Sequence, residues 1–245
     1  MREVILEISD FSVYYNEKGS GMFSKKNRRQ VVKSVSFELF EGEILGLVGE
    51  SGCGKSSLAR GILGLEPDCS GQVVTNAASP QMIFQDPFGS LNPRMTVARI
   101  VEEPLIIYGM KDRKVRQEQV VEMLKLVGLD ERFLPRLPHE LSGGQRQRVS
   151  IAVALIAGPR LLIADEFVSA LDATIQVQIL DLLWEIHEKL ALSILLISHD
   201  LAVVESLCDR VLIMLGGEIV ESGKIDEVFS KPNHKYTKQL LSAKG

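Results

Sequence analysis

The sequence predicts an α/β fold with a largely parallel central sheet, from two observations. Short apolar runs typical of buried strands alternate with segments in which apolar residues recur at helical spacing. A glycine-rich turn, Gly49–Ser56, joins one such strand directly to a helix. In the second half of the chain the predicted strands are Leu161–Ala164, Ile194–Ile197 and Arg210–Leu215, and the predicted helices are Ala173–Leu190 and Ala202–Cys208.

The first part of the chain is less regular. Two predicted strands, Val4–Ile8 and Ser34–Phe40, flank the segment Asn16–Arg29. The Gly, Ser, Lys and Arg residues of that segment predict a loop or a long hairpin tip, with a basic stretch near residues 24–30. The other predicted elements here are the strands Ile44–Val48 and Met82–Phe84 and a helix, Lys55–Leu65.

A helical block interrupts the alternation between residues 85 and 158. Its predicted helices are Thr96–Tyr108, Lys114–Val127 and Gly143–Ala157, the last of which Ser142 would cap. The second of these helices would pack through an apolar stripe formed by Val115, Val120, Val121, Leu124 and Val127. We therefore expect one domain over residues 1–245, with a helical subdomain over residues 86–158.

Composition and charge exclude several classes of protein. Of the 245 residues, 45% are hydrophobic and 24% charged, as in ordinary globular domains. A formal charge of −4 and a pI near 5.7 provide no basic field for nucleic acid. The three cysteines form no CxxC pair, which favours a reducing cytosol over a disulfide or metal framework. No apolar run approaches the roughly 18 residues that span a bilayer, and the charged N-terminus is not a signal peptide, so we expect a soluble intracellular protein.

The turn Gly49–Ser56 matches the pattern GxxxxGK[ST] between a strand and a helix. Its glycines allow successive backbone N–H groups to face an anion, and the helix N-terminus adds its dipole. Lys55 would supply a positive charge to the β- and γ-phosphates of a nucleotide, and the Ser56 hydroxyl would bind Mg²⁺. The expected nucleotide contacts are Gly49, Glu50, Ser51, Gly52, Cys53, Gly54, Lys55, Ser56 and Ser57.

An apolar strand ends in two carboxylates, Asp165 and Glu166. Adjacent charges at the end of a buried strand are costly unless they are used. Asp165 would hold Mg²⁺, and Glu166 would polarise an attacking water.

The segment Leu141–Gln145 reads LSGGQ and resembles the signature of the ATP-binding cassette (ABC) ATPases. The resemblance implies that the nucleotide is ATP, and that the fold is a P-loop NTPase core with an N-terminal antiparallel β part and a helical subdomain. It also implies that a second subunit's nucleotide receives a γ-phosphate cap from Ser142, Gly143, Gly144 and Gln145.

Further segments resemble the family's motifs in the family's order. Gln85 resembles the Q-loop glutamine, Asp172 ends a segment similar to the D-loop, and His199 resembles the switch histidine that contacts the γ-phosphate. Tyr15 resembles the aromatic residue that stacks on adenine, whereas packing within a strand is the competing interpretation. The resemblance thus implies catalytic roles for Lys55, Gln85, Glu166 and His199, and Mg²⁺ ligation by Ser56, Gln85 and Asp165.

Three segments, Gly49–Ser56, Phe84–Thr96 and the tail Pro232–Thr237, resemble peptide and nickel importer ATPases. The chain departs from the family pattern at several positions. Phe167 and Val168 replace the usual Pro and Thr after Glu166. Val153 replaces an Arg of the signature helix, and Lys235 replaces a Pro of the tail. The stretch Gly71–Gln85 is shorter than usual, so a peripheral hairpin is expected to be trimmed. No cysteine-rich extension follows, so no iron–sulfur cluster is expected.

The resemblance implies an ATPase subunit that powers an importer of peptides, nickel or metal chelates through ATP-driven closure of two ATPase subunits. The expected partners are two membrane permeases, a second ATPase subunit of the same or another kind and, indirectly, a substrate-binding protein, but no nucleic acid. The expected place is the cytoplasmic face of the cell membrane. The alternatives are a soluble ABC ATPase of DNA repair or translation, and an exporter or regulatory cassette. The residues leave the cargo open.

Overall fold

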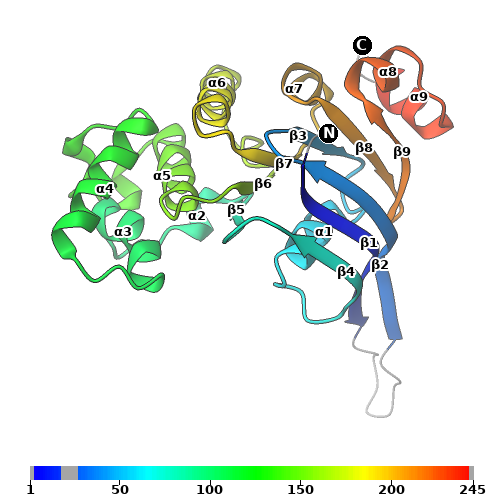
Figure 1. The fold of residues 1–245 in the computed structure, drawn as a ribbon. Helices are drawn as coiled ribbons and strands as arrows, with labels where there is room; N and C mark the ends of the chain where they lie inside the picture. Colours follow the sequence, from blue (N-terminus) through cyan, green and yellow to red (C-terminus); the bar gives the residue numbers. More distant parts are fainter. Residues whose placement is uncertain (1–2, 18–26, 243–245) are drawn as a thin grey trace. The chain divides into compact units, whose positions relative to one another are not determined.

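The computed structural model describes residues 3–17 and 27–242 (Figure 1). The chain divides into two compact units, which are described separately. The first unit comprises residues 1–77 and 193–245, and the second comprises residues 78–192. The predicted helical subdomain, 86–158, falls inside the second unit, and its status as a subdomain of one domain stays a prediction.

The first unit contains an antiparallel sheet in which β1 lies between β2 and β4. It also contains a parallel group in which β3 lies between β7 and β8, with β9 antiparallel to β8 (Figure 1). Every residue of β3 and β7 is buried, as expected of central parallel strands. These strands are β1 Val4–Glu17, β2 Asn27–Phe40, β3 Ile44–Val48, β4 Cys69–Thr75, β7 Ser193–Ile197, β8 Arg210–Leu215 and β9 Glu218–Lys224.

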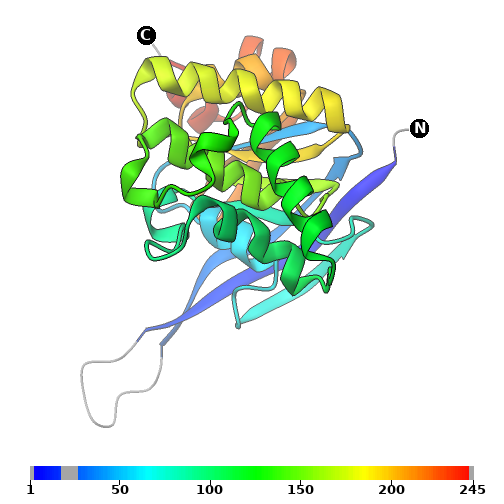
Figure 2. The same ribbon diagram turned by 90° about the vertical axis from the view of Figure 1, so that its left-hand side faces the viewer.

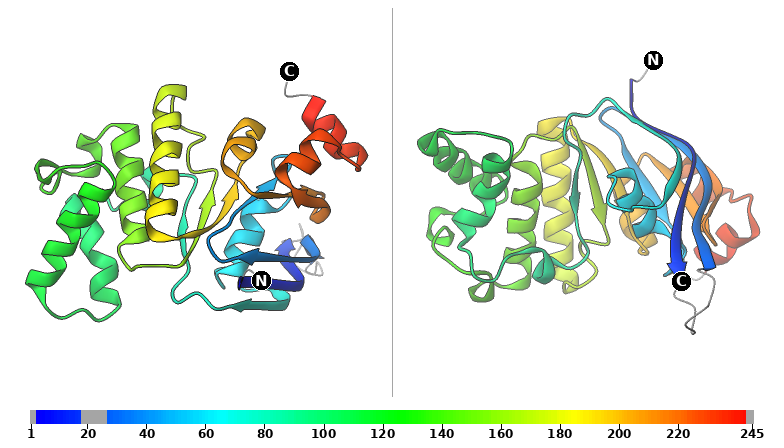
Figure 3. Two further views of the ribbon diagram at one scale, coloured as in Figure 1. Left: turned by 45° about the horizontal axis from the view of Figure 1, so that its top comes forward. Right: turned by 90° about the horizontal axis from the view of Figure 1, so that it is seen from below.

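Four helices accompany these strands. Helix α1 packs on β1 and β2, α7 packs on β3, and α8 packs on β8 and β9. The C-terminal helices lie beside β9 in both views of Figure 3. The helices are α1 Lys55–Ile62, α7 Leu201–Leu207, α8 Ile225–Ser230 and α9 Lys235–Ser242.

The second unit combines a parallel strand pair with a group of helices (Figure 2). Helix α5 lies at the centre of this group and contacts α2, α3, α4 and α6. The elements are β5 Gln81–Ile83, β6 Leu161–Asp165, α2 Pro87–Ser90, α3 Val97–Ile107, α4 Arg113–Leu126, α5 Gly143–Leu155 and α6 Ala173–Leu190, with 3₁₀ turns at Glu131–Phe133 and Pro138–Glu140.

The α/β class with a largely parallel sheet and an antiparallel N-terminal part is confirmed. The predicted bounds of β3, α6 and β8 agree with the structure. The segment Asn16–Arg29 was predicted as a loop or a long hairpin tip. The antiparallel pairing of β1 with β2 agrees with a long hairpin. The predicted bounds of the tip are too wide, because β1 continues to Glu17 and β2 begins at Asn27. Residues 18–26, including the first part of the basic stretch, lie outside the described residues, whereas Arg28 and Arg29 belong to β2.

Several elements were not predicted from the sequence. These are β4, β9, the short helix α2, and the two C-terminal helices α8 and α9. Strand β4 has no buried residue, so it lacks the apolar alternation that identifies a strand. The apolar stripe of α4 is only partly correct. Val120, Leu124 and Val127 are buried, whereas Val115 is 39% exposed. Among the described residues, no helix has the length and apolar character to cross a membrane.

Candidate nucleotide site

The phosphate loop connects β3 to α1 in the first unit, as predicted. Gly52 and Gly54 have φ values of 81° and 110°, in the left-handed region that glycine tolerates best. Gly49 needs to be glycine for a different reason. A Cβ at this position would lie 2.2 Å from the carbonyl oxygen of Met214 on β8. The tight packing against β8 and the two left-handed glycines together give the loop its shape.

Lys55, the first residue of α1, is only 4% exposed. Its Nζ donates hydrogen bonds to the carbonyl oxygens of Gly49, at 2.8 Å, and Glu50, at 3.1 Å. The ammonium group is therefore folded back over the loop that carries it. A buried positive charge beside the N-terminus of a helix suits the phosphates of a nucleotide.

Tyr15 on β1 lies close to the helix that follows the phosphate loop. Its hydroxyl donates to Glu66 Oε1 at 2.7 Å and lies 3.1 Å from the hydroxyl oxygen of Ser57 on α1. Burial raises the pKa of Tyr15, and the adjacent Glu66 carboxylate adds to the rise, so the phenol stays protonated near neutral pH. The side chain is thus anchored beside α1, and its stacking on adenine stays a prediction.

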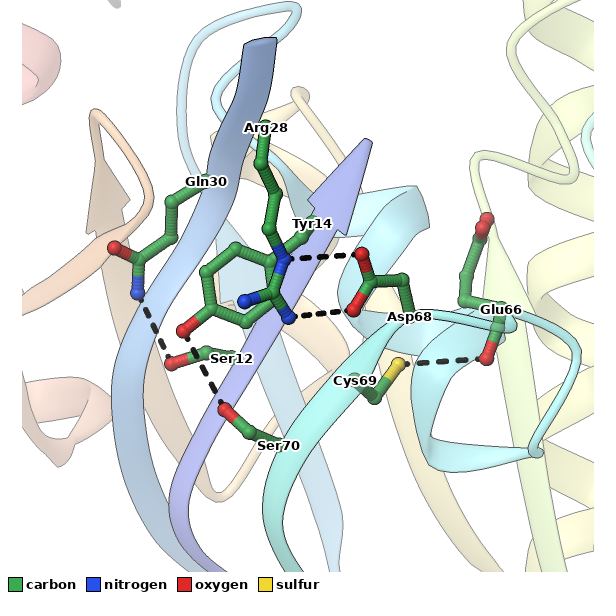
Figure 4. Close-up of polar contacts among 8 residues, drawn as sticks. All are labelled: Ser12, Tyr14, Arg28, Gln30, Glu66, Asp68, Cys69 and Ser70. Carbon is green, nitrogen blue, oxygen red and sulfur yellow. Dashed lines mark hydrogen bonds and ion pairs between the residues drawn. The ribbon is translucent and has the colours of Figure 1, made fainter. Parts of the chain in front are cut away.

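The neighbouring Tyr14 has a different environment (Figure 4). The guanidinium of Arg28 lies over its ring, 3.6 Å from the ring centre, and binds both carboxylate oxygens of Asp68. The backbone N–H of Tyr14 donates to the carbonyl of Asp68. Tyr14 on β1 therefore contacts Arg28 on β2 and Asp68 just before β4. These contacts support strand packing as the role of this tyrosine.

In the second unit, Gln85 and Glu166 follow the paired strands β5 and β6. The Nε2 of Gln85 donates to Oε2 of Glu166 at 3.0 Å. Glu166 has a φ of 44°, unusual for a residue with a side chain, and its carbonyl accepts hydrogen bonds from the backbone N–H and the hydroxyl of Ser169. Asp165 is 2% exposed at the end of β6. The two residues in place of the family's Pro and Thr, Phe167 and Val168, are both buried.

The signature segment begins helix α5. Ser142 Oγ accepts the backbone N–H of Gln145 at 3.3 Å, and Gln145 Oε1 accepts the N–H of Ser142 at 2.9 Å. This reciprocal pair is a capping box and confirms the predicted helix start. Gly144 also has a packing role, because a Cβ there would lie 2.6 Å from Cγ2 of Ile175 on α6.

Asp172 and His199 lie at the starts of helices. Oδ1 of Asp172 accepts the N–H of Ile175, so Asp172 caps α6. His199 is exposed in the turn between β7 and α7. Ser198 Oγ accepts the N–H of Asp200, and Asp200 caps α7, so the residues on both sides of His199 are fixed.

The predicted site residues fall into two groups. The first unit contains Tyr15, the loop 49–57 and His199, and the second contains Gln85, Asp165, Glu166, Ser142–Gln145 and Asp172. The predicted Mg²⁺ ligands offer a hydroxyl, an amide and one buried carboxylate, the hard oxygen donors that Mg²⁺ prefers. Among the described residues there is no cluster of three or more His, Cys, Asp or Glu that could hold a metal ion.

One contact at the phosphate loop was not predicted. Tyr236 on α9 accepts a hydrogen bond from the backbone N–H of Glu50 at 3.0 Å. The sequence did single out the tail Pro232–Thr237, but as a resemblance only. A contact between residues so far apart in the chain leaves no local sequence signal.

A comparison with protein families matches residues 32–169 to the ABC transporter model. The chain belongs to the ABC transporter family. This ABC ATPase is 46% identical to the oligopeptide transport ATP-binding protein OppF of Salmonella typhimurium, in a match that covers 99% of this chain and 78% of OppF. It is 42% identical to the dipeptide transport ATP-binding protein DppF of Haemophilus influenzae, over 94% of this chain and 75% of DppF.

A solved structure supports the same assignment. The ATP-binding cassette MJ0796, dimeric and bound to ADP and Pi, is 28% identical and superposes with a TM-score of 0.75 over 90% of this chain and 99% of its own. As a family member, this ABC ATPase binds and hydrolyses ATP as the ATP-binding subunit of a transporter.

Proposed function

We propose that this ABC ATPase powers the uptake of peptides through a membrane importer. The observation that carries the proposal is the 46% identity to an oligopeptide transport ATP-binding protein over 99% of this chain. The resemblance of Phe84–Thr96 and of the tail Pro232–Thr237 to the same branch of the family supports it. In this proposal the subunit acts at the cytoplasmic face of the membrane, where it contacts two permease subunits. A substrate-binding protein delivers the peptide to those permeases.

The contacts around the phosphate loop support a role for it in ATP binding. Lys55 and the N–H groups at the start of α1 would hold the phosphates, and the Tyr15 ring would stack on the adenine. Mg²⁺, held by oxygens of Ser56, Gln85 and Asp165, would neutralise phosphate charge.

We assign the proton transfer to Glu166. Its carboxylate would accept a proton from the attacking water. Gln85 is hydrogen-bonded to that carboxylate at 3.0 Å and would orient the carboxylate. His199 would contact the γ-phosphate from its exposed position in the turn before α7. Lys55 would stabilise the charge that develops on the transferred group.

The chain carries one phosphate loop and one signature segment, so it provides two half-sites. In our proposal a second ATPase subunit, identical or related, completes each site with its own Ser142–Gln145 and Asp172. Closure of the pair would move the permeases, and hydrolysis would reset them.

The cargo is tested by uptake in the organism that encodes the chain. Cells that lack this chain should lose uptake of a radiolabelled tripeptide and regain it with the wild-type chain, but not with Glu166→Gln at equal protein level. Uptake of radioactive Ni²⁺, measured in parallel, should not change. Loss of Ni²⁺ uptake with normal peptide uptake would contradict the peptide assignment and favour a nickel importer.

A further inference from the structure

The C-terminal helix α9 reaches the phosphate loop through one side chain. Tyr236 is 7% exposed, and its hydroxyl accepts the backbone N–H of Glu50 at 3.0 Å. The two residues are 186 positions apart in the chain. None of the roles assigned so far uses this contact, although the tail containing Tyr236 was singled out by its sequence.

The contact engages the peptide group that also holds Lys55. The Glu50 N–H belongs to the peptide bond between Gly49 and Glu50, and the carbonyl of that same bond accepts Lys55 Nζ at 2.8 Å. One planar peptide group therefore links the tyrosine hydroxyl to the lysine ammonium. Hydrogen bonds at the two ends of a peptide group polarise and strengthen each other.

The position of Tyr236 is itself fixed by strand β9. Glu221 on β9 accepts the N–H groups of Asn233, at 2.7 Å, and His234, at 3.0 Å, just before α9. Nδ1 of His234 then accepts the N–H of Tyr236 at 3.2 Å. A continuous series of hydrogen bonds therefore runs from β9 through the start of α9 to the phosphate loop, and the C-terminal helices lie beside β9 in Figures 1 and 3.

We infer that Tyr236 is a positioning residue of the nucleotide site. Its hydroxyl fixes the Gly49–Glu50 peptide, and through that peptide the Lys55 ammonium, in the geometry that receives the phosphates of ATP. The inference rests on the proposed role of Gly49–Ser56 as the phosphate-binding loop. It gives the tail of this ABC ATPase a task in nucleotide binding that is separate from the contacts of the adenine ring.

The test compares Tyr236→Phe with the wild-type protein. The substitution keeps the buried ring and removes only the hydroxyl, so the fold should persist. Because one hydrogen bond is lost, the Kd for ATP should rise about threefold to tenfold, and KM should rise with it while kcat stays near the wild-type value. Inorganic triphosphate should lose affinity by the same factor, since the effect concerns the phosphates alone. Tyr15→Ala should weaken ATP binding by a larger factor than triphosphate binding, because triphosphate has no adenine ring.

Two further variants sharpen the test. Tyr108→Phe removes a hydroxyl that is bonded instead to the side chain of Gln81, and its Kd should equal that of the wild type. Glu221→Gln weakens the anchor of α9, so ATP affinity should fall in the same direction. The double variant Tyr236→Phe/Glu221→Gln should lose no more than Tyr236→Phe alone, because both act through one contact.

An unchanged Kd for ATP in Tyr236→Phe, with unfolding temperatures like those of the wild type, would overturn the inference. So would equal losses in Tyr236→Phe and Tyr108→Phe. If Tyr236→Phe is unstable, an unchanged Kd in Glu221→Gln overturns it instead. Failure of the wild-type protein to bind both ATP and triphosphate would show that the loop assignment itself is wrong, which is a separate outcome.

Discussion

The amide of Gln85 donates a hydrogen bond to the carboxylate of Glu166 over 3.0 Å. The two residues follow β5 and β6, which run parallel, so their side chains meet at the same edge of the strand pair. In this arrangement the amide occupies one oxygen of the carboxylate that we propose as the base. In our proposal, movement of Gln85 would therefore change how the Glu166 carboxylate contacts the attacking water molecule.

Glu166→Gln should retain ATP binding and lose turnover. The amide has nearly the same shape as the carboxylate but cannot accept the proton from water, and general base catalysis contributes about 10²- to 10⁴-fold. A stable ATP-bound dimer should accumulate, which gel filtration with ATP would detect. Hydrolysis at the wild-type rate would contradict the assignment of Glu166, and Lys55→Ala serves as the control that loses nucleotide binding.

Gln85→Glu should lower the ATPase rate more than Gln85→Ala does. Both variants remove the hydrogen bond from the Gln85 amide to Glu166, but only Gln85→Glu places a second negative charge beside the carboxylate that we propose as the base. Steady-state ATPase rates of the two variants at equal protein level measure the difference. Equal rates would show that Gln85 does not face Glu166 during turnover.

Ser142 can be tested for two separate roles. Ser142→Ala removes the side-chain cap of α5 and should cost about 0.5 to 2 kcal/mol of unfolding free energy. Ser142→Asp keeps a good cap but places a negative charge where a γ-phosphate is expected, so stability should persist while ATPase activity is lost. Chemical unfolding and ATPase rates measured on both variants separate the roles. An active Ser142→Asp variant would exclude a phosphate contact.

Phe167→Ala should strongly destabilise the protein. Phe167 is 2% exposed and among the largest fully buried side chains, and truncation of a buried Phe costs about 3 to 5 kcal/mol. Val177→Ala, at a residue that is 57% exposed, should change stability by less than about 0.5 kcal/mol. Equal unfolding midpoints in urea for the two variants would show that Phe167 is not part of the core.

The docking of the tail should depend on pH through Glu221. Burial tends to raise the pKa of this carboxyl, but the hydrogen bonds from the N–H groups of Asn233 and His234 lower it overall. A carboxylate with a lowered pKa stabilises the folded state above its ordinary pKa, and this contribution disappears as the pH falls through the folded value.

The stability difference between wild type and Glu221→Gln should therefore be larger at pH 7 than at pH 3.5. Urea unfolding at both values measures it, with Glu227→Gln, an exposed carboxylate on α8, as the control. A difference that does not vary with pH would contradict the lowered pKa of Glu221.

Most of the central strands and of the local site geometry could be predicted, because the signals are local. Gly42 and Gly49 bound β3, and Asp172 marks the start of α6 with its capping side chain. Edge strands could not be found in the same way. Strand β4 is stabilised by its hydrogen bonds to β1, and its own side chains are mostly exposed, so its sequence resembles a loop.

The candidate site also contains features with a local sequence signal and features without one. The phosphate loop and the Ser142 cap of α5 depend on residues close in sequence, and both agree with the prediction. The reciprocal bond from Ser142 to Gln145 was not predicted. The contact of Tyr236 with Glu50 depends on the packing of the last helix, which no local pattern encodes.

The close approach of Gly144 to Ile175 has an evolutionary consequence. A side chain at position 144 would meet Cγ2 of Ile175 at 2.6 Å, so the two positions constrain each other's size. Relatives with Ala or Ser at the position of Gly144 should carry a smaller residue at the position of Ile175. Part of the glycine requirement in this signature segment would then reflect the spacing of two helices, and an inactive Gly144→Ala variant would regain activity when Ile175→Ala is added.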